Sequence, residues 1–340
     1  MAILAAAAAA VVAVVGGGHS ANSSAPQVKN RGRRAATATA AERKQIARAL
    51  RRGVTAAHRL GGSVEAAAML GPWRAPVVAT SDPHGRRRWM RMWSMSKIVT
   101  AVALLRSMGW GRTPGRPLSP EVIAALQAAI TRSENCPQRR IVLELQRSLG
   151  ESTARARRAV ATVLRLAGGR ARPGAEVVPP DPSCLEFLES QSEISDPLGP
   201  ALLLGISEWR VTDAARFMHA LGSDVYGRAI SQRLLALMRE PKARSREIVA
   251  GEFTAPVDWG AGRALAVFHP AYKAGWGGTQ EGEFLAGQMA LIRLPAGGWA
   301  TLAVMFHPAV QPAVDDPGLT RAPEALEVVM RSFAQALREG

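Results

Sequence analysis

Segments with the alternating pattern of β-strands lie in two groups that are separated by a long helical part of the chain. The first group covers residues 64–69, 75–80 and 86–92, and the second covers residues 272–274, 287–294 and 299–307. Between the groups, apolar residues recur with helical spacing over residues 94–108, 120–166, 211–221 and 230–240. Amphipathic helices are expected before and after, at residues 41–59 and 322–338. This order predicts an α+β fold in which an antiparallel sheet is flanked by N- and C-terminal helices and is interrupted by a large all-helical insertion domain.

The same order sets the predicted domain boundaries. Residues 41–92 and 263–340 form the α/β sheet domain, and residues 93–262 form the helical domain. The helical domain contains a stretch rich in Pro, Gly, Ser and acidic residues, residues 168–208, which is longer than a passive connection in a compact domain. Long ordered loops often carry function, and a cleft between two domains is the usual place for a site.

The first 40 residues have the composition of an export signal followed by a linker. Residues 2–15 are uniformly apolar and precede three glycines and a run of small residues, so residues 1–25 resemble a secretory signal peptide, although no Lys or Arg precedes the apolar run. The run is shorter than the roughly 20 residues of a membrane span. We therefore expect a secreted or cell-envelope protein with no stable membrane span after cleavage. Residues 26–40 lack apolar periodicity, which predicts a basic flexible linker.

Basic residues outnumber acidic residues by 43 to 27, for a net charge of +16. Ten basic residues, against Glu42 alone, lie between Lys29 and Leu60. Nucleic-acid binding would need aromatic or base-reading side chains beside these arginines, and it would give a salt-sensitive affinity that disappears with residues 26–60. We expect no nucleic-acid partner, and we assign the basic segment to a solvated surface or to polyanions of the cell envelope.

The tetrad Ser94-Met95-Ser96-Lys97 is the first of three short motifs that can carry chemistry. Ser94 follows a predicted strand and opens an apolar helix, where free backbone N–H groups and the positive helix end meet. Lys97 lies one turn later on the same helix face. A lysine held in an apolar cleft has its ammonium form disfavoured, so it can act as the general base that a serine nucleophile requires. Taken alone, this tetrad is more often a helix cap beside a surface lysine.

The second motif is Ser133-Glu134-Asn135, which follows a helix that ends near Ile130. Its hydroxyl and its amide are two positions apart and can face the same cleft. The hydroxyl can relay a proton, and the amide can hold an amide group of a substrate. Asn135 is also the only asparagine after residue 30, in a chain where asparagine is rare.

The third motif is Lys273-Ala274-Gly275, within a strand pattern near the end of the chain. Lys273 offers a fixed cation to a substrate carboxylate, and Gly275 lets a ligand lie against the strand backbone. The N–H groups of Trp276 and Ser94 are candidate oxyanion donors. All three motifs therefore supply groups that acyl transfer needs.

The ordered trio resembles the motifs of the penicillin-recognising serine hydrolases, the superfamily of class A β-lactamases and DD-peptidases, whose marks are S-x-x-K, S-D-N and K-T-G. The order of predicted elements is similar to that family's layout from about residue 41 to residue 340. The resemblance implies an exported serine hydrolase that acts on a small-molecule β-lactam or on a peptidoglycan-like peptide.

By this resemblance, Ser94 is the acylated nucleophile, Lys97 is its base and Ser133 relays a proton to the leaving nitrogen. Asn135 contacts the substrate amide, and Lys273 anchors the substrate carboxylate. Each role agrees with the interpretation of the residues themselves.

Two positions depart from the family's pattern. Ala274 stands where the family usually has Thr or Ser, so one hydroxyl that would bind the substrate carboxylate is absent. Glu134 replaces an aspartate, which is a milder change. The resemblance therefore implies weaker binding of a β-lactam carboxylate, while Gly275 and Trp276 keep their expected places in the substrate-binding strand.

Deacylation is the step for which the sequence offers the weakest candidate. Class A lactamases use a loop glutamate, with an asparagine four residues later, to hold the hydrolytic water, and residues 168–208 contain no asparagine. Glu193 is the candidate carboxylate, although Pro197 lies at that offset, and Asp196 is the alternative. Without such a group an acyl-enzyme would form and turn over slowly, as in a penicillin-binding protein.

The two cysteines, Cys136 and Cys184, either form a disulfide that ties the long loop to the Ser133 turn or remain as two buried thiols. The six histidines have no metal-ligand spacing, and no dinucleotide-binding loop is present, so we expect no metal and no cofactor. Two alternatives to a β-lactam or peptidoglycan hydrolase remain open. One is a hydrolase of an unrelated ester or amide, and the other is a non-catalytic envelope-binding module on the same fold.

Overall fold

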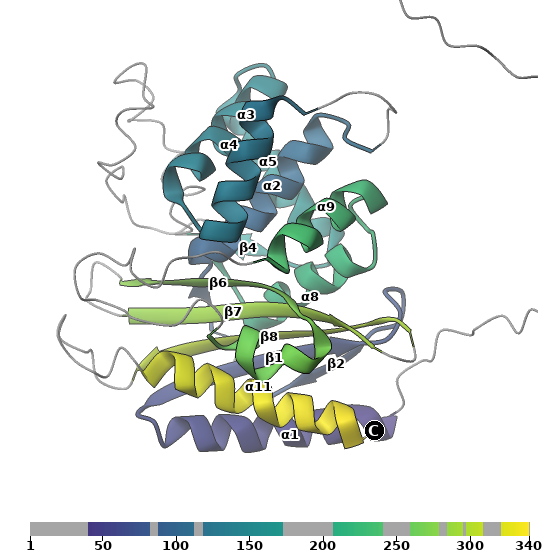
Figure 1. Cartoon of the computed structure of the whole chain (residues 1–340), viewed down its shortest axis with the longest axis vertical. Coiled ribbons are helices and arrows are strands. Elements are labelled where there is room, and N and C mark those ends of the chain that lie inside the picture. Colours follow the sequence, from purple (N-terminus) through teal and green to yellow (C-terminus); the bar gives the residue numbers. More distant parts are fainter. Residues whose placement is uncertain are drawn as a thin grey trace, which may run out of the picture. The chain divides into compact units, whose positions relative to one another are not determined.

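A five-stranded antiparallel sheet joins the two predicted groups of strands in the computed structural model (Figure 1). Its order is β2-β1-β8-β7-β6, and the strands span Val77–Thr80, Gly62–Leu70, Trp299–Pro308, Phe284–Arg293 and Ala271–Gly278. The two groups meet where β1 pairs with β8, from Gly62 opposite Pro308 to Leu70 opposite Ala300. The structure describes residues 40–81, 88–111, 118–172, 207–240, 259–278, 284–294, 297–308 and 321–339.

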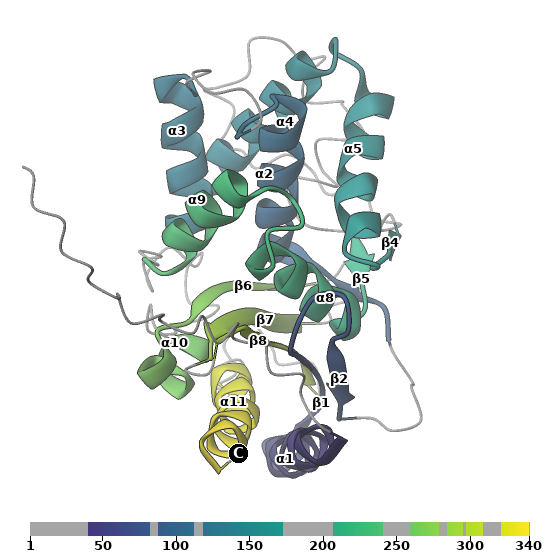
Figure 2. The ribbon, with the colours of Figure 1, turned by 90° about the vertical axis from the view of Figure 1, so that its right-hand side faces the viewer.

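Apolar side chains project from both faces of this sheet, because every second residue of a strand points to the same side. In β1, Ala66, Ala68 and Leu70 belong to one buried cluster, whereas Ala67 and Met69 belong to another. The first cluster packs against α1 (Ala40–His58) and α11 (Arg321–Glu339), and these two helices lie side by side below the sheet (Figure 2). The second cluster packs against the helices of the insertion.

The insertion is built around α2 (Ser96–Ser107), in which ten of the twelve residues are buried. A helix that is buried on all sides belongs at the centre of a bundle. The helices around it are α3 (Pro120–Gln127), α4 (Asn135–Ser148), α5 (Thr153–Leu166), α8 (Val211–Gly222) and α9 (Arg228–Met238). The start of α3 follows the sequence prediction, since Ser119 accepts a hydrogen bond from the Val122 N–H and proline occupies the first helical position.

The predicted fold class is therefore confirmed, although some element boundaries are wrong. The strand expected at residues 75–80 begins at Val77, because Pro76 has no N–H to donate and the Ala75 N–H bonds to the Pro72 carbonyl in a turn. Of the strand expected at residues 86–92, only β3 (Met90–Arg91) forms within the described residues.

The predicted loop 168–208 also begins and ends in short strands. A small sheet in the order β3-β5-β4 pairs Met90–Arg91 with β5 (Glu208–Trp209) and β5 with β4 (Ala171–Arg172). Two short helices before β6 were not predicted, namely α10 (Ala261–Ala264) and η5 (Ala266–Phe268).

No helix in the described ranges combines the length and the apolar character that a membrane crossing requires. The predicted signal peptide and most of the predicted linker, residues 1–39, lie outside the described residues. The domain boundaries at residues 92 and 262 remain predictions, as do the two N-terminal segments.

Candidate active site

Ser94 lies in a single tight turn between β3 and α2. This turn, η1, spans Trp93–Met95, and α2 begins only at Ser96, so the expectation that Ser94 opens the α-helix is wrong by two residues. Trp93 causes the break because it adopts a φ of 44°, a left-handed conformation that is unusual for a bulky residue. Such strained conformations cluster at functional sites.

Lys97 extends from the first turn of α2 into the interior and is 0% exposed. Its Nζ donates a hydrogen bond of 2.8 Å to Asn135 Oδ1 and another to the carbonyl oxygen of Ser133. A buried amine needs such acceptors, because the loss of water around it would otherwise be costly. The first two motifs therefore meet at this amine.

Ser133 takes its place through two irregular backbone features. The π-helical turn η2 (Ala128–Arg132) ends at Ser133, which has a φ of 62° and a ψ of 22° in the left-handed region. Glu134 then returns to an extended conformation, forms an ion pair with Arg132, and leads into α4. Both π-helical turns and left-handed residues other than glycine are frequent at functional sites.

Lys273 approaches Ser133 from the opposite side, on strand β6. Its Nζ donates to Ser133 Oγ at 2.7 Å and to the Ala274 carbonyl oxygen at 3.1 Å. Burial lowers the pKa of the Lys273 amine from 10.5 to about 7. An anionic group that binds beside this amine would favour its charged form and raise the pKa again.

Gly275 brings β6 against the Ser94 turn. A Cβ atom at this position would lie 2.8 Å from the Met92 carbonyl oxygen and 2.9 Å from the Ser94 backbone nitrogen. Only glycine fits that distance. The group that approaches here is the protein's own turn, whereas the sequence prediction placed a ligand against Gly275, and that prediction stays untested. Because β6 is an edge strand of the sheet, alternate N–H groups of β6 point away from β7. Trp276 follows on the same strand and is half-buried.

Contacts thus connect all three sequence motifs. Lys97, Asn135, Ser133 and Lys273 form one hydrogen-bonded series, and the Ser94 backbone lies against β6. Trp93 is the member of this site that the sequence did not reveal, because no sequence pattern signals a left-handed tryptophan.

Two predicted features fall partly or wholly outside the described residues. Glu193 and Asp196, the candidate deacylation carboxylates, lie outside them, and so does Cys184. Cys136 is disulfide-bonded, and its pairing with Cys184 remains a prediction. Within the described ranges, no three His, Cys, Asp or Glu residues gather as a metal site would require.

No known protein family and no curated protein matches this chain in sequence. Its structure nevertheless matches solved proteins over most of their length. A β-lactamase from Desulfarculus baarsii has a TM-score of 0.50 and 18% identity, with 85% of this chain and 97% of that chain covered. A class A β-lactamase from Bacteroides cellulosilyticus has a TM-score of 0.53 and 14% identity, with 86% and 99% covered.

A third similar structure is that of PBP-A, solved as a variant in an acyl-enzyme complex with penicillin G. Its TM-score is 0.51 and its identity is 15%, with 87% of this chain and 97% of that chain covered. At such identities the likeness concerns the fold. The chain therefore has the fold of the penicillin-recognising serine hydrolases, as the class A β-lactamases and PBP-A have it.

Proposed function

We propose that the protein is an exported serine acyl hydrolase that is acylated at Ser94 by a β-lactam or a peptidoglycan-like peptide. The observation that carries the proposal is the meeting of Lys97, Ser133, Asn135 and Lys273 beside the Ser94 turn. A nucleophile, a buried amine, a hydroxyl relay and a cation are the groups that such acyl transfer uses. The acyl-enzyme of PBP-A with penicillin G supports the substrate class by analogy.

Acylation begins when Ser94 Oγ attacks the carbonyl carbon of the substrate. Lys97, in its neutral form, takes the proton from that hydroxyl, and the carbonyl oxygen becomes an oxyanion. The backbone N–H groups of Ser94 and Trp276 hold the oxyanion, where such donors are worth most because they are fixed in advance.

Collapse of this intermediate breaks the carbon–nitrogen bond and leaves the acyl group on Ser94 Oγ. The leaving nitrogen takes a proton from the Ser133 hydroxyl, which in turn takes the proton held by Lys97. The hydrogen bond from Lys273 to Ser133 Oγ orients this hydroxyl and supports the relay role. No proton is gained or lost overall.

Hydrolysis of the acyl-enzyme needs a group that activates water, and Glu193 is our proposal for it. Because residues 168–208 offer no asparagine to help hold that water, we propose slow turnover as the alternative. The protein would then act as a penicillin-binding or DD-peptidase-like protein rather than as an efficient lactamase. A non-catalytic envelope-binding module on this fold is the remaining alternative.

The N-terminal part supports a proposal about location. A cleavable signal at residues 1–25 would deliver the protein to the cell envelope or the medium. There, the exposed arginines of α1 and of the turn after it, among them Arg48, Arg51, Arg52 and Arg59, would attract envelope polyanions.

Intact mass measurement tests the proposal. The mature protein is incubated with a fluorescent penicillin and, separately, with a chromogenic cephalosporin, beside the Ser94→Ala variant. We expect an adduct that depends on Ser94 and that persists if turnover is slow. Rapid ring opening without an adduct would mean efficient hydrolysis. Neither an adduct nor turnover with the folded protein would overturn the proposed β-lactam chemistry.

A further inference from the structure

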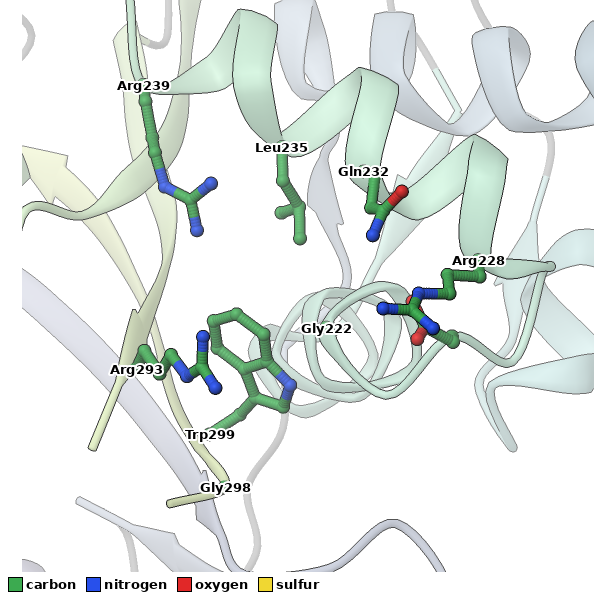
Figure 3. A pocket seen from close by; sticks show the side chains of 9 residues that line it. Gly222, Arg228, Gln232, Leu235, Arg239, Arg293, Gly298 and Trp299 are labelled. Atoms are coloured by element: carbon green, nitrogen blue, oxygen red, sulfur yellow. The ribbon is translucent and has the colours of Figure 1, made fainter. Parts of the chain in front are cut away.

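A cleft lined by none of the candidate active-site residues lies between α9 and the hairpin that joins β7 to β8 (Figure 3). Its volume is about 490 Å³, within the usual range of small-molecule sites. Three arginines, Arg228, Arg239 and Arg293, and the indole of Trp299 line it. We propose that this cleft binds a multiply charged phosphate anion of the pyrophosphate type.

Two walls carry the basic groups. Arg228 begins α9 and Arg239 caps its C-terminal end. They lie on one face with Gln232 and Leu235 between them, because spacings of four, three and four residues return to the same side. Arg293 and Trp299 form the opposite wall, since they are paired across the β7–β8 hairpin. Figure 3 shows these side chains directed into one space.

The charges in the cleft are unbalanced. Asp224 is the single acidic residue that lines it, against three guanidinium groups. In the described part of the chain, no hydrogen bond or ion pair engages the guanidinium groups of Arg228, Arg239 and Arg293. Like charges that converge on a concave space repel one another, and a multivalent anion placed between them removes that repulsion.

Stability of the fold does not account for the gathering of three arginines here, although Arg239, at the C-terminal end of α9, is favourably placed for the helix dipole. All three are exposed, so their packing contributes little. Arg228 is the first residue of α9, and the first turn of this helix contains no acidic residue. A cation at that end is unfavourable because the helix dipole is positive there. The convergence of such residues points to a ligand.

The donor chemistry selects the class of ligand. Guanidinium groups bind phosphate oxygens through paired hydrogen bonds, and arginines on two facing walls suit two linked phosphates. The half-buried indole of Trp299 offers an apolar face to a ring attached to the phosphates. Inorganic pyrophosphate and a nucleoside diphosphate share this chemistry, and they differ in whether the indole contributes.

Calorimetric titration of the full chain with inorganic pyrophosphate, at about 0.15 M salt, tests the proposal. We expect saturable binding that weakens at least about tenfold in the variant Arg228→Gln/Arg239→Gln, because two charge-assisted contacts are lost. The matched control, Arg157→Gln/Arg158→Gln, removes the same charge from exposed positions of α5 outside the cleft and should leave the affinity unchanged. A cooperative thermal transition of Arg228→Gln/Arg239→Gln, close to that of the wild type, separates loss of the ligand from loss of the fold.

Each outcome decides the matter. Equal weakening in the two double variants would show diffuse attraction to a basic protein and would overturn the proposal, as would the absence of binding to the folded protein. Tighter binding of a nucleoside diphosphate than of pyrophosphate, lost in Trp299→Leu, would place a ring on the indole. Equal affinity for pyrophosphate and for the nucleoside diphosphate would show that the site recognises the two phosphates and not a ring. Binding should persist in Ser94→Ala, so this test is independent of the proposed acylation.

Discussion

Ala274 is the residue at which the candidate site departs most from the pattern that it resembles. It follows Lys273 on β6, and its carbonyl oxygen already accepts a hydrogen bond from the Lys273 amine. Its methyl group offers no donor to a substrate carboxylate. The cation at Lys273 therefore has to bind that carboxylate without help from a neighbouring hydroxyl.

Restoring the hydroxyl should strengthen the reaction with carboxylate-bearing β-lactams. For Ala274→Thr we expect the acylation rate at low substrate concentration to rise by about tenfold, since one hydrogen bond to a charged group is worth about 1.5 kcal/mol or more. Ala274→Val adds similar bulk without a hydroxyl and serves as the control. Equal rates for the two variants in stopped-flow measurements would contradict the role given to this position.

Lys273 should impose a pH dependence on the same reaction. Its pKa is lowered to about 7 by burial, so the amine loses its charge as the pH rises through neutrality, and a substrate carboxylate loses its anchor. We expect the acylation rate of the wild type to fall between about pH 6 and pH 9 relative to that of Lys273→Arg, because arginine stays protonated throughout. A constant ratio of the two rates across this range would contradict the assignment.

At the scale of elements, the contact between β6 and η1 positions the nucleophile. The Ser94 nitrogen and the Met92 carbonyl oxygen both lie where a side chain at position 275 would begin. The edge strand and the strained turn therefore fix each other, and the substrate-binding strand is held beside the serine.

A methyl group added at position 275 should push β6 away from the turn that holds Ser94. Gly275→Ala is expected to destabilise the protein by about 1–3 kcal/mol, because the added carbon overlaps backbone atoms that cannot move freely. It should also slow acylation by about 100-fold through displacement of Ser94. In Gly169→Ala, the new methyl group would lie 3.4 Å from its nearest neighbour, an ordinary contact, so this control should change neither property. Denaturant unfolding and acylation kinetics measure both effects.

Helices were predictable where burial of one side repeats apolar residues at helical spacing. The irregular turns were not predictable in this way. The helices α2, α8 and α11 follow apolar spacing that the sequence displays directly. The turn η1 escaped prediction because Trp93 adopts a conformation that tertiary packing imposes. In the same way, the sequence motifs predicted that Ser133 and Lys273 belong to the site. They did not predict the left-handed conformation of Ser133 or its hydrogen bonds to Lys97 and Lys273.

On the scale of the whole described unit, the sheet needs helices on both faces. Its lower face is covered by α1 and α11, and Leu326, Val329, Met330 and Phe333 of α11 are all 0% exposed. Each such side chain contributes about 1.5–3 kcal/mol when fully buried, so together they match the entire net stability of an ordinary domain.

Removal of this helix should therefore abolish cooperative folding. We expect a chain that ends at residue 308 to show no sigmoidal thermal transition by circular dichroism, because α1 alone would leave much of this face of the sheet in water. A chain that starts at residue 35 retains the compact unit of residues 35–340 and should unfold as the full chain does. A cooperative transition in the C-terminally shortened chain would contradict the role of α11.

The central claim is that Ser94 is the nucleophile, and peptide mapping after reaction with penicillin tests it most directly. Trypsin cleaves after Arg91 and after Lys97, which isolates residues 92–97 with two serines, Ser94 and Ser96. We predict that fragmentation places the penicilloyl group on Ser94, that Ser96→Ala keeps the adduct and that Ser94→Ala loses it. An adduct on Ser96 or Ser133, or one that survives in folded Ser94→Ala, would contradict the account.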